Sequence, residues 1–190
     1  MNHLRTLGAL LILTAVPAWA GEFSVVVPEK SALTFVAKQM NVPVEGGFKK
    51  FSALVAFDPA KPETGKAQIE IDLASVDAGS ADADQEVKGK AWFNVRDYPT
   101  AKFVASEVKS LGGNRYQASG KMTIKGKTRE VVAPFATKLD AGMLLIDGSI
   151  PILRLQYGVG DGTWADTATV ADEVQVRFHL TLTAAPSKKK

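Results

Sequence analysis

Apolar and polar residues alternate with a period of two through most of the chain. This spacing is typical of β-strands with one face on an apolar interior and the other in water. Turn signals such as Asp58-Pro59 and Gly112-Gly113-Asn114 separate the alternating segments. The pattern predicts strands over residues 33–38, 51–57, 67–73, 102–108, 116–124, 129–137, 143–152 and 174–183.

One segment departs from this pattern and predicts a short helix over residues 80–93. Ser80 is suited to cap its start, and acidic residues occupy the first turn, where the helix dipole favours anions. Asp84 and Lys88 have the spacing of a helical ion pair. Because this helix interrupts a long connection between strands, we expect it to cover one end of the fold.

The predicted fold class is therefore all-β, an antiparallel barrel of about eight strands with one short covering helix. A closed barrel leaves no exposed sheet edge, which favours it for a chain of this length. A sandwich of two sheets remains the structural alternative, since the period of the sequence is the same in both.

The N-terminus has the features of a secretory signal peptide. Arg5 precedes the apolar run 6–16, and Ala18-Trp19-Ala20 has the small-x-small form of a cleavage site. The run is shorter than the ~20 residues that span a bilayer. We therefore predict a signal over residues 1–20, cleavage after Ala20, and export to the periplasm. The barrel domain is expected over residues 21–185, followed by a basic tail over 186–190.

Charge and composition exclude several function classes. With Arg5 and the three C-terminal lysines set aside, 19 basic residues stand against 20 acidic ones, so the formal charge of +3 belongs to the termini. A near-neutral body argues against nucleic acid as a partner. Cysteine is absent from the sequence, which excludes disulfides, thiolate metal sites and a cysteine nucleophile.

Motifs for catalysis or metal binding are incomplete. His179 is the one histidine after the predicted signal, and its place on the polar face of the last strand predicts a surface residue. The run Asp82–Glu86 lacks the glycine and final glutamate of a calcium loop. Gly126-Lys127-Thr128 lacks the earlier glycine of a phosphate loop, and the glycines of 158–162 are not followed by a helix. We therefore expect no enzyme activity, no metal and no cofactor.

The apolar face itself is the remaining functional feature. Phenylalanines recur at its period-two positions, and they are compatible with a packed core or with a lined cavity, since an eight-stranded barrel can be filled or can hold one ligand. These residues are Phe35, Phe51, Phe57, Phe103, Phe135 and Phe178.

Several segments, in order, resemble the YceI family of exported polyisoprenoid-binding proteins with a lipocalin-like barrel. The resemblance covers most of the chain after the predicted signal. It is carried by Ser31–Phe35, Gly46–Asp58, Ser75–Asp77, Trp92–Phe103, Gly120–Arg129, Arg154–Val159 and Val170–Val176.

The resemblance implies a periplasmic protein that carries or sequesters a long-chain isoprenoid lipid or quinone. Lys38-Gln39-Met40 and Trp164-Ala165-Asp166 look like a subgroup found beside membrane cytochrome b561 proteins, which favours a quinone ligand and such a protein as partner. Two alternatives stay open: an adaptor with a solid core, and an enzyme that acts on a lipid inside the barrel.

The expected ligand site follows from this interpretation. Trp92 and Phe93 are expected to close or gate one end, and Gln39 and Arg154 to contact a head group. The tunnel lining is predicted to be Phe35, Phe51, Val55, Phe57, Phe103, Met122, Phe135, Ile146 and Phe178.

Overall fold

The computed structural model describes residues 22–185. The predicted signal over residues 1–20 and the basic tail over 186–190 lie outside the described residues, so both stay predictions. Within residues 22–185, no helix combines the length and the apolar character needed to cross a membrane.

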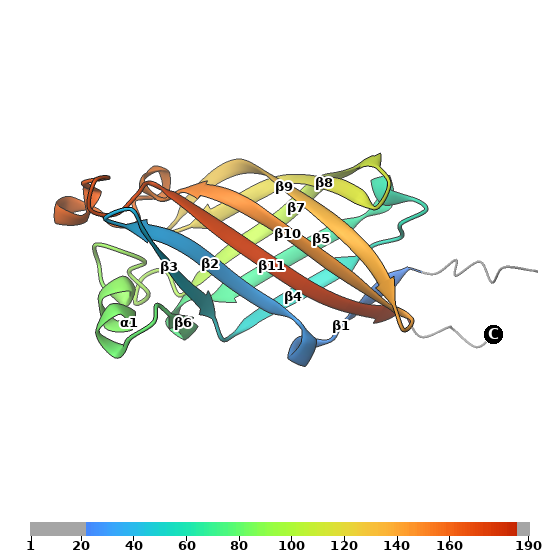
Figure 1. The fold of residues 1–190 in the computed structure, drawn as a ribbon, viewed down its shortest axis with the longest axis horizontal. Coiled ribbons are helices and arrows are strands. Elements are labelled where there is room, and N and C mark those ends of the chain that lie inside the picture. The colour runs from blue at the N-terminus through green and yellow to red at the C-terminus, as the bar shows by residue number, and fades with distance from the viewer. Residues whose placement is uncertain (1–21, 186–190) are drawn as a thin grey trace, which may run out of the picture.

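Eleven strands of the described chain form one sheet in which paired strands run antiparallel (Figure 1). They are β1 (Phe23–Val26), β2 (Ala32–Gln39), β3 (Val42–Phe48), β4 (Phe51–Ala56), β5 (Lys66–Asp72), β6 (Val76–Asp77), β7 (Thr100–Gly112), β8 (Arg115–Ile124), β9 (Lys127–Asp140), β10 (Met143–Leu153) and β11 (Glu173–Ala184). The hydrogen-bonded order is β4-β5-β7-β8-β9-β10-β11-β2-β3-β6, with β1 also paired to β11. One continuous sheet excludes the sandwich alternative for this part of the chain.

The eleven segments correspond to the eight strands of a barrel, because three of those eight strands are each interrupted and so divided into two segments. β1 and β2 pair with the same strand, β11, and only the turn η1 (Pro28–Lys30) separates them. The β3–β4 strand pairs with the β5–β6 strand, which is broken by η3 (Leu73–Ser75). Phe23 and Phe57 exchange two backbone hydrogen bonds, of 2.9 and 3.0 Å, which join β1 to the end of β4 and close the ring. The predicted antiparallel barrel is confirmed, with more segments than expected.

β3 is the main strand that the sequence pattern missed. Pro43, Glu45, Gly46 and Gly47 interrupt its alternation, yet it pairs with β2 along its whole length, from Val42 to Phe48. The pairing partner, rather than the residues of β3, therefore determines this strand.

The helix α1 (Ala81–Lys88) begins where it was expected. The Ser80 hydroxyl accepts the Ala83 N–H at 3.2 Å and caps it. The predicted extension to Phe93 is wrong, because Gly89 is extended and ends the helix. The expected pairing of Asp84 with Lys88 gives way to a hydrogen bond of 2.6 Å from the Ala78 N–H to the Asp84 carboxylate.

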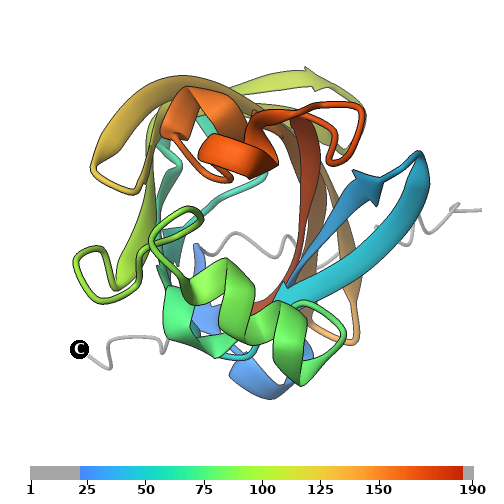
Figure 2. The ribbon, with the colours of Figure 1, turned by 90° about the vertical axis from the view of Figure 1, so that its left-hand side faces the viewer.

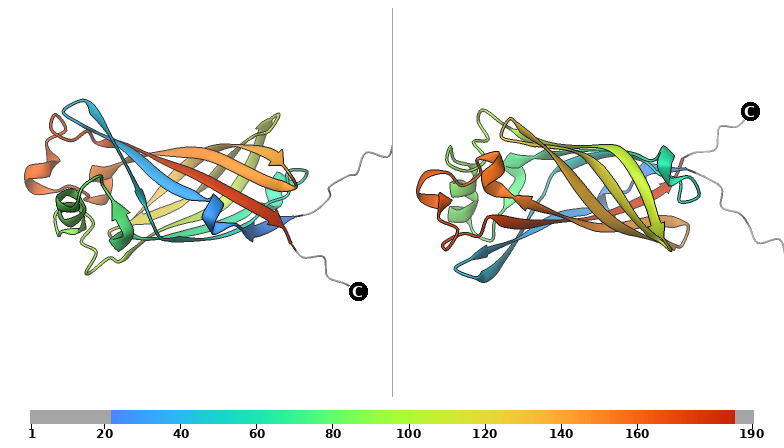
Figure 3. Two further views of the ribbon diagram at one scale, coloured as in Figure 1. Left: turned by 60° about the horizontal axis from the view of Figure 1, so that its bottom comes forward. Right: turned by 90° about the horizontal axis from the view of Figure 1, so that it is seen from above.

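The two ends of the barrel differ. α1 lies at one end together with η4 (Arg154–Tyr157) and η5 (Gly162–Ala165), which we call the mouth (Figures 2 and 3). The other end, where β1 begins and β11 ends, is filled by an aromatic core, which we call the closed end. There the ring centroids of Phe57, Tyr116 and Phe135 lie 5.1 to 5.6 Å apart. η2 (Pro62–Thr64) joins β4 to β5.

Candidate ligand cavity

A cavity of about 490 Å³ occupies the mouth half of the barrel, and we call it the main cavity. Its walls come from α1, the strands near the mouth, and the segment of residues 154–172 that connects β10 to β11. Most of its lining is apolar, including Phe35, Val44, Phe48, Val87, Trp92, Phe93, Ile124, Ile152, Val159 and Val176. Three of its four charged side chains, Lys38, Asp82 and Glu86, are exposed, which places them at the rim, and the fourth, Arg154, is buried.

The interior stays open partly because phenylalanine rings occupy the space over glycines of neighbouring strands. A Cβ atom built on Gly46 would lie 2.8 Å from Cε1 of Phe35, its cross-strand partner. Gly148 would overlap in the same way with the ring of its partner Phe178. Both rings therefore lie against the sheet, where a side chain on the facing residue would have pushed them toward the barrel axis.

A second, small cavity of about 80 Å³ lies nearer the closed end. Its lining includes Val55, Phe57, Phe103, Phe135 and Ile146, most of which are buried and pack in the same apolar cluster. The barrel is therefore hollow at the mouth and nearly solid at the closed end.

The predicted lining residues divide between these two regions. Those on the main cavity are Phe35, Gln39, Trp92, Phe93, Met122 and Arg154. Those on the small cavity are Val55, Phe57, Phe103, Met122, Phe135, Ile146 and Phe178. Phe51 lines neither and packs against the core. The predicted lining residues thus lie in two regions and not in one tunnel, because large aromatic side chains fill the closed end.

Arg154 does not have free donors for a head group, which corrects the expectation for this residue. It is 3% exposed, and all five of its N–H groups bond to backbone carbonyls. Nε donates to Ala171, Nη1 to Val159 and Gly160, and Nη2 to Trp164 and Val170, at 2.7 to 3.0 Å. Burial lowers the pKa of Arg154. Its role is to hold the connection between β10 and β11 over the mouth.

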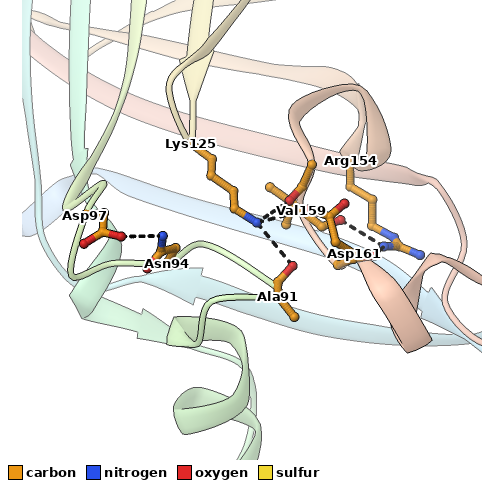
Figure 4. A network of polar contacts seen from close by, with 9 residues as sticks. Ala91, Asn94, Asp97, Lys125, Arg154, Val159 and Asp161 are labelled. Carbon is orange, nitrogen blue, oxygen red and sulfur yellow. Dashed lines mark hydrogen bonds and ion pairs between the residues drawn. The ribbon is translucent and has the colours of Figure 1, made fainter.

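Lys125 ties the same connection to the segment after α1 (Figure 4). Its Nζ donates to the carbonyl oxygens of Gly158 and of Ala91, the latter at 3.3 Å, and lies 3.4 Å from the Asp161 carboxylate. The Ala91 carbonyl also accepts the N–H groups of Gly160 and Asp161 at 2.9 Å. Two largely buried cations thus satisfy backbone carbonyls and build the mouth.

Two tryptophans meet where α1 and η5 approach each other. The indole N–H of Trp164 donates to Oε1 of Glu86 at 2.8 Å, across 78 positions of sequence. The ring centroids of Trp164 and Trp92 lie 5.5 Å apart, and Cζ of the Arg154 guanidinium lies 5.5 Å from the Trp92 centroid. Trp92 therefore lies at the mouth as expected; its gating role stays a prediction.

Two buried polar atoms, in residues that line the main cavity, have no hydrogen-bond partner among the described residues. They are the Tyr157 hydroxyl and the Trp92 indole N–H. Tyr157 is 1% exposed, and burial raises the pKa of its hydroxyl. Buried polar groups are normally paired, and these two unpaired donors have almost no accessible surface, so a ligand would reach them only after neighbouring side chains shift. Sequence reasoning missed Tyr157, although it belongs to the Arg154–Val159 segment that carried the family resemblance.

Within residues 22–185, the titratable groups outside the mouth form no comparable site. His179 is partly exposed and pairs with Asp147 at 2.6 Å, in agreement with the predicted surface position. No group of three or more metal-ligating side chains occurs within the described residues.

Comparisons with known proteins agree with this architecture. The model of the YceI-like domain family matches residues 25–182. A UPF0312 protein of Photorhabdus laumondii is 34% identical over 129 residues, 67% of this chain and 66% of that protein. A UPF0312 protein of Azotobacter vinelandii is 36% identical over 87 residues, 46% of this chain and 45% of the relative. The chain thus matches between about half and two thirds of the length of these relatives.

Solved structures extend the comparison to the fold. BcnA of Burkholderia cenocepacia has a TM-score of 0.81 and 49% identity, over 83% of this chain and 99% of BcnA. A polyisoprenoid binding domain from Saccharophagus degradans has a TM-score of 0.65 at 18% identity, over 87% of this chain and 99% of that domain. The second likeness is one of fold alone. Since the family match spans most of the chain, the protein belongs to the YceI family.

Proposed function

We propose that the protein binds one long-chain isoprenoid lipid, with its tail in the main cavity and its head group at the mouth. The observation that carries this proposal is an apolar cavity of about 490 Å³ inside a YceI-family barrel. The name of the related polyisoprenoid binding domain supports the same class of ligand.

Burial of the tail supplies most of the binding free energy in this proposal. Each buried methylene group contributes about 0.8 kcal/mol, so a prenyl tail needs few polar contacts. Side chains such as Phe35, Phe93 and Val176 line the cavity and are only partly buried. They gain apolar contact when a tail occupies the space.

The polar groups of the mouth favour a neutral head group, and we propose a quinone. Arg154 is fully bonded to carbonyls, and Lys125 is held by Ala91, Gly158 and Asp161, so neither is free for a phosphate. The rim carries Asp82 and Glu86 against Lys38, which gives no net positive field. The free donors of Tyr157 and Trp92 are suited to the carbonyl oxygens of a quinone.

The cellular setting is part of the proposal. The N-terminal sequence predicts export, and we propose that the protein carries or sequesters its ligand in the periplasm. A membrane protein of the cytochrome b561 type is the proposed partner, on the resemblance of two short segments at the mouth, 38–40 and 164–166.

The two alternatives fit the geometry less well. An adaptor with a solid core does not account for a hollow of this size. An enzyme acting on a lipid needs an acid or base beside the ligand, and the carboxylates among the described lining residues are Asp82 and Glu86 at the rim.

Titration of tryptophan fluorescence tests the proposal, because quinones quench indole emission and Trp92 and Trp164 both line the cavity. A prenylated quinone should quench in a saturable manner. The same quinone head without a tail, and a polyprenyl phosphate measured by its displacement of the bound quinone, should bind at least about tenfold more weakly. Equal affinity for the tailless head would contradict burial of the tail.

Ala101→Phe supplies a filled-cavity variant, since Ala101 is buried and lines the main cavity. Ala136→Phe is the matched control, because Ala136 is exposed on a strand. We expect the first substitution to abolish binding and the second to leave it unchanged. Val44→Phe, at a less buried lining position, repeats the test if Ala101→Phe does not fold.

A further inference from the structure

The main and small cavities meet at three side chains, which line both of them. These are Ile71 on β5, Met122 on β8 and Val176 on β11. Together they form a partition across the barrel, with the hollow mouth half on one side and the nearly solid closed end on the other.

Only one member of this partition can move at little cost. Ile71 and Val176 are branched at Cβ, which restricts rotation about their first side-chain bond. Met122 is unbranched, has three rotatable bonds beyond Cα, and adapts readily to irregular space. Met122 is 4% exposed, so its side chain contacts neighbouring residues and almost no solvent.

The wall beyond Met122 offers no large obstacle from its own strand. The next two inward positions on β8 toward the closed end are Gly120 and Ala118, both buried. Ala118 lines the small cavity, as does Ala133, its partner on β9. The Phe103 ring of β7 covers Gly120, with its Cε2 atom 2.9 Å from the Cβ position of that glycine. A rotation of the Met122 side chain would therefore connect the two cavities past the Phe103 ring.

We propose that Met122 is a movable partition that decides how long a lipid tail the barrel accepts. A short tail fills the main cavity while Met122 stays in place. A longer tail displaces the Met122 side chain and places its end in the small cavity, until Phe57, Tyr116 and Phe135 stop it. This inference rests on the proposed function and adds the residue that sets tail length.

The test compares quinones that share a head group and differ in tail length, bound to the full mature chain. The quantity measured is the ratio of the dissociation constants for a short-tailed and a long-tailed member. Met122→Ala should raise the preference for the long tail about tenfold, the gain from burying roughly two more methylene groups. Met122→Trp should remove that preference. The ratio is the readout because Met122 also lines the main cavity, so a substitution there changes the affinity for both members.

Met143→Trp is the matched control, since Met143 lines neither cavity and its sulfur lies near the exposed Lys30. A ratio unchanged in both Met122 variants, with the short-tailed quinone still bound, would overturn this inference and leave the proposed function standing. Failure of every quinone to bind the wild-type protein would instead overturn the proposed function. Met122→Ile, which keeps the volume close to that of methionine but is branched at Cβ, replaces Met122→Trp if that variant does not fold, and should likewise remove the preference.

Discussion

The ring of Phe35 lies directly over Gly46, its cross-strand partner in the β2–β3 hairpin, at a distance that leaves no room for a Cβ atom. The Asp77 carbonyl of β6 closes the same space from another side, 2.5 Å from that Cβ position. A glycine on one strand thus determines where an aromatic ring on the next strand lies. Because the ring is against the sheet, the mouth half of the barrel stays hollow.

Substitution of Gly46 by alanine should therefore disturb both stability and binding. The added methyl group must displace the Phe35 ring or the Asp77 backbone, and overpacking of this kind lowers the free energy of unfolding by about 1–3 kcal/mol. Urea denaturation measures the loss. Gly47→Ala is the control, since the nearest atom to its Cβ position is the Leu33 carbonyl oxygen at 3.0 Å, and its loss should be smaller. An equal effect of both substitutions would contradict the account.

Arg154→Met should destabilise the mouth strongly. The substitution leaves five backbone carbonyls without donors, and we expect the free energy of unfolding to fall by about 3–5 kcal/mol. Arg154→Lys should recover part of the lost free energy of unfolding, because lysine retains three donors. Arg177→Lys, at an exposed site 3.6 Å from Glu45, is the control and should change stability by less than about 0.5 kcal/mol. Normal stability of Arg154→Met would exclude the structural role.

Tyr157→Phe should separate stability from affinity. Removal of a buried hydroxyl that has no partner in the protein should leave the free energy of unfolding unchanged or raise it by up to about 1 kcal/mol. Affinity for a prenylated quinone should fall about fivefold to tenfold, the effect of one lost hydrogen bond. Tyr116→Phe, at the closed end, should leave affinity unchanged. Unaltered quinone affinity in Tyr157→Phe would place the head group elsewhere.

The hydrogen bond from Trp164 to Glu86 should slow ligand release, because it connects η5 to α1 at the mouth. Trp164→Phe and Glu86→Ala should each raise the dissociation rate about fivefold, measured by stopped-flow displacement. Glu86→Gln keeps an acceptor oxygen and should behave like the wild type. The double variant Trp164→Phe, Glu86→Ala should release ligand no faster than either single variant. Additive effects would mean that the two residues act separately.

Much of the barrel could be predicted from the sequence, since strands with one buried face must alternate. The pattern failed at β3, where Pro43, Gly46 and Gly47 remove the alternation and pairing with β2 determines the strand. It also placed the end of α1 too late, because the stop depends on the backbone conformation of Gly89.

The candidate site was less predictable, for a physical reason. Whether a phenylalanine fills the barrel or lies against its wall depends on the residue facing it across the sheet, as Gly148 faces Phe178. The spacing of apolar residues along one strand does not determine its register with the neighbouring strand, so the facing residue could not be predicted. The role of Arg154 depends in the same way on five carbonyls brought around it by the fold between Val159 and Ala171.

The central claim is that the barrel holds an isoprenoid lipid, and native mass spectrometry of the mature protein purified from its own host tests it most directly. The account predicts a stoichiometric adduct that organic extraction identifies as a prenylated quinone. A ligand-free mass that stays unchanged after incubation with quinones and polyprenols would contradict the account.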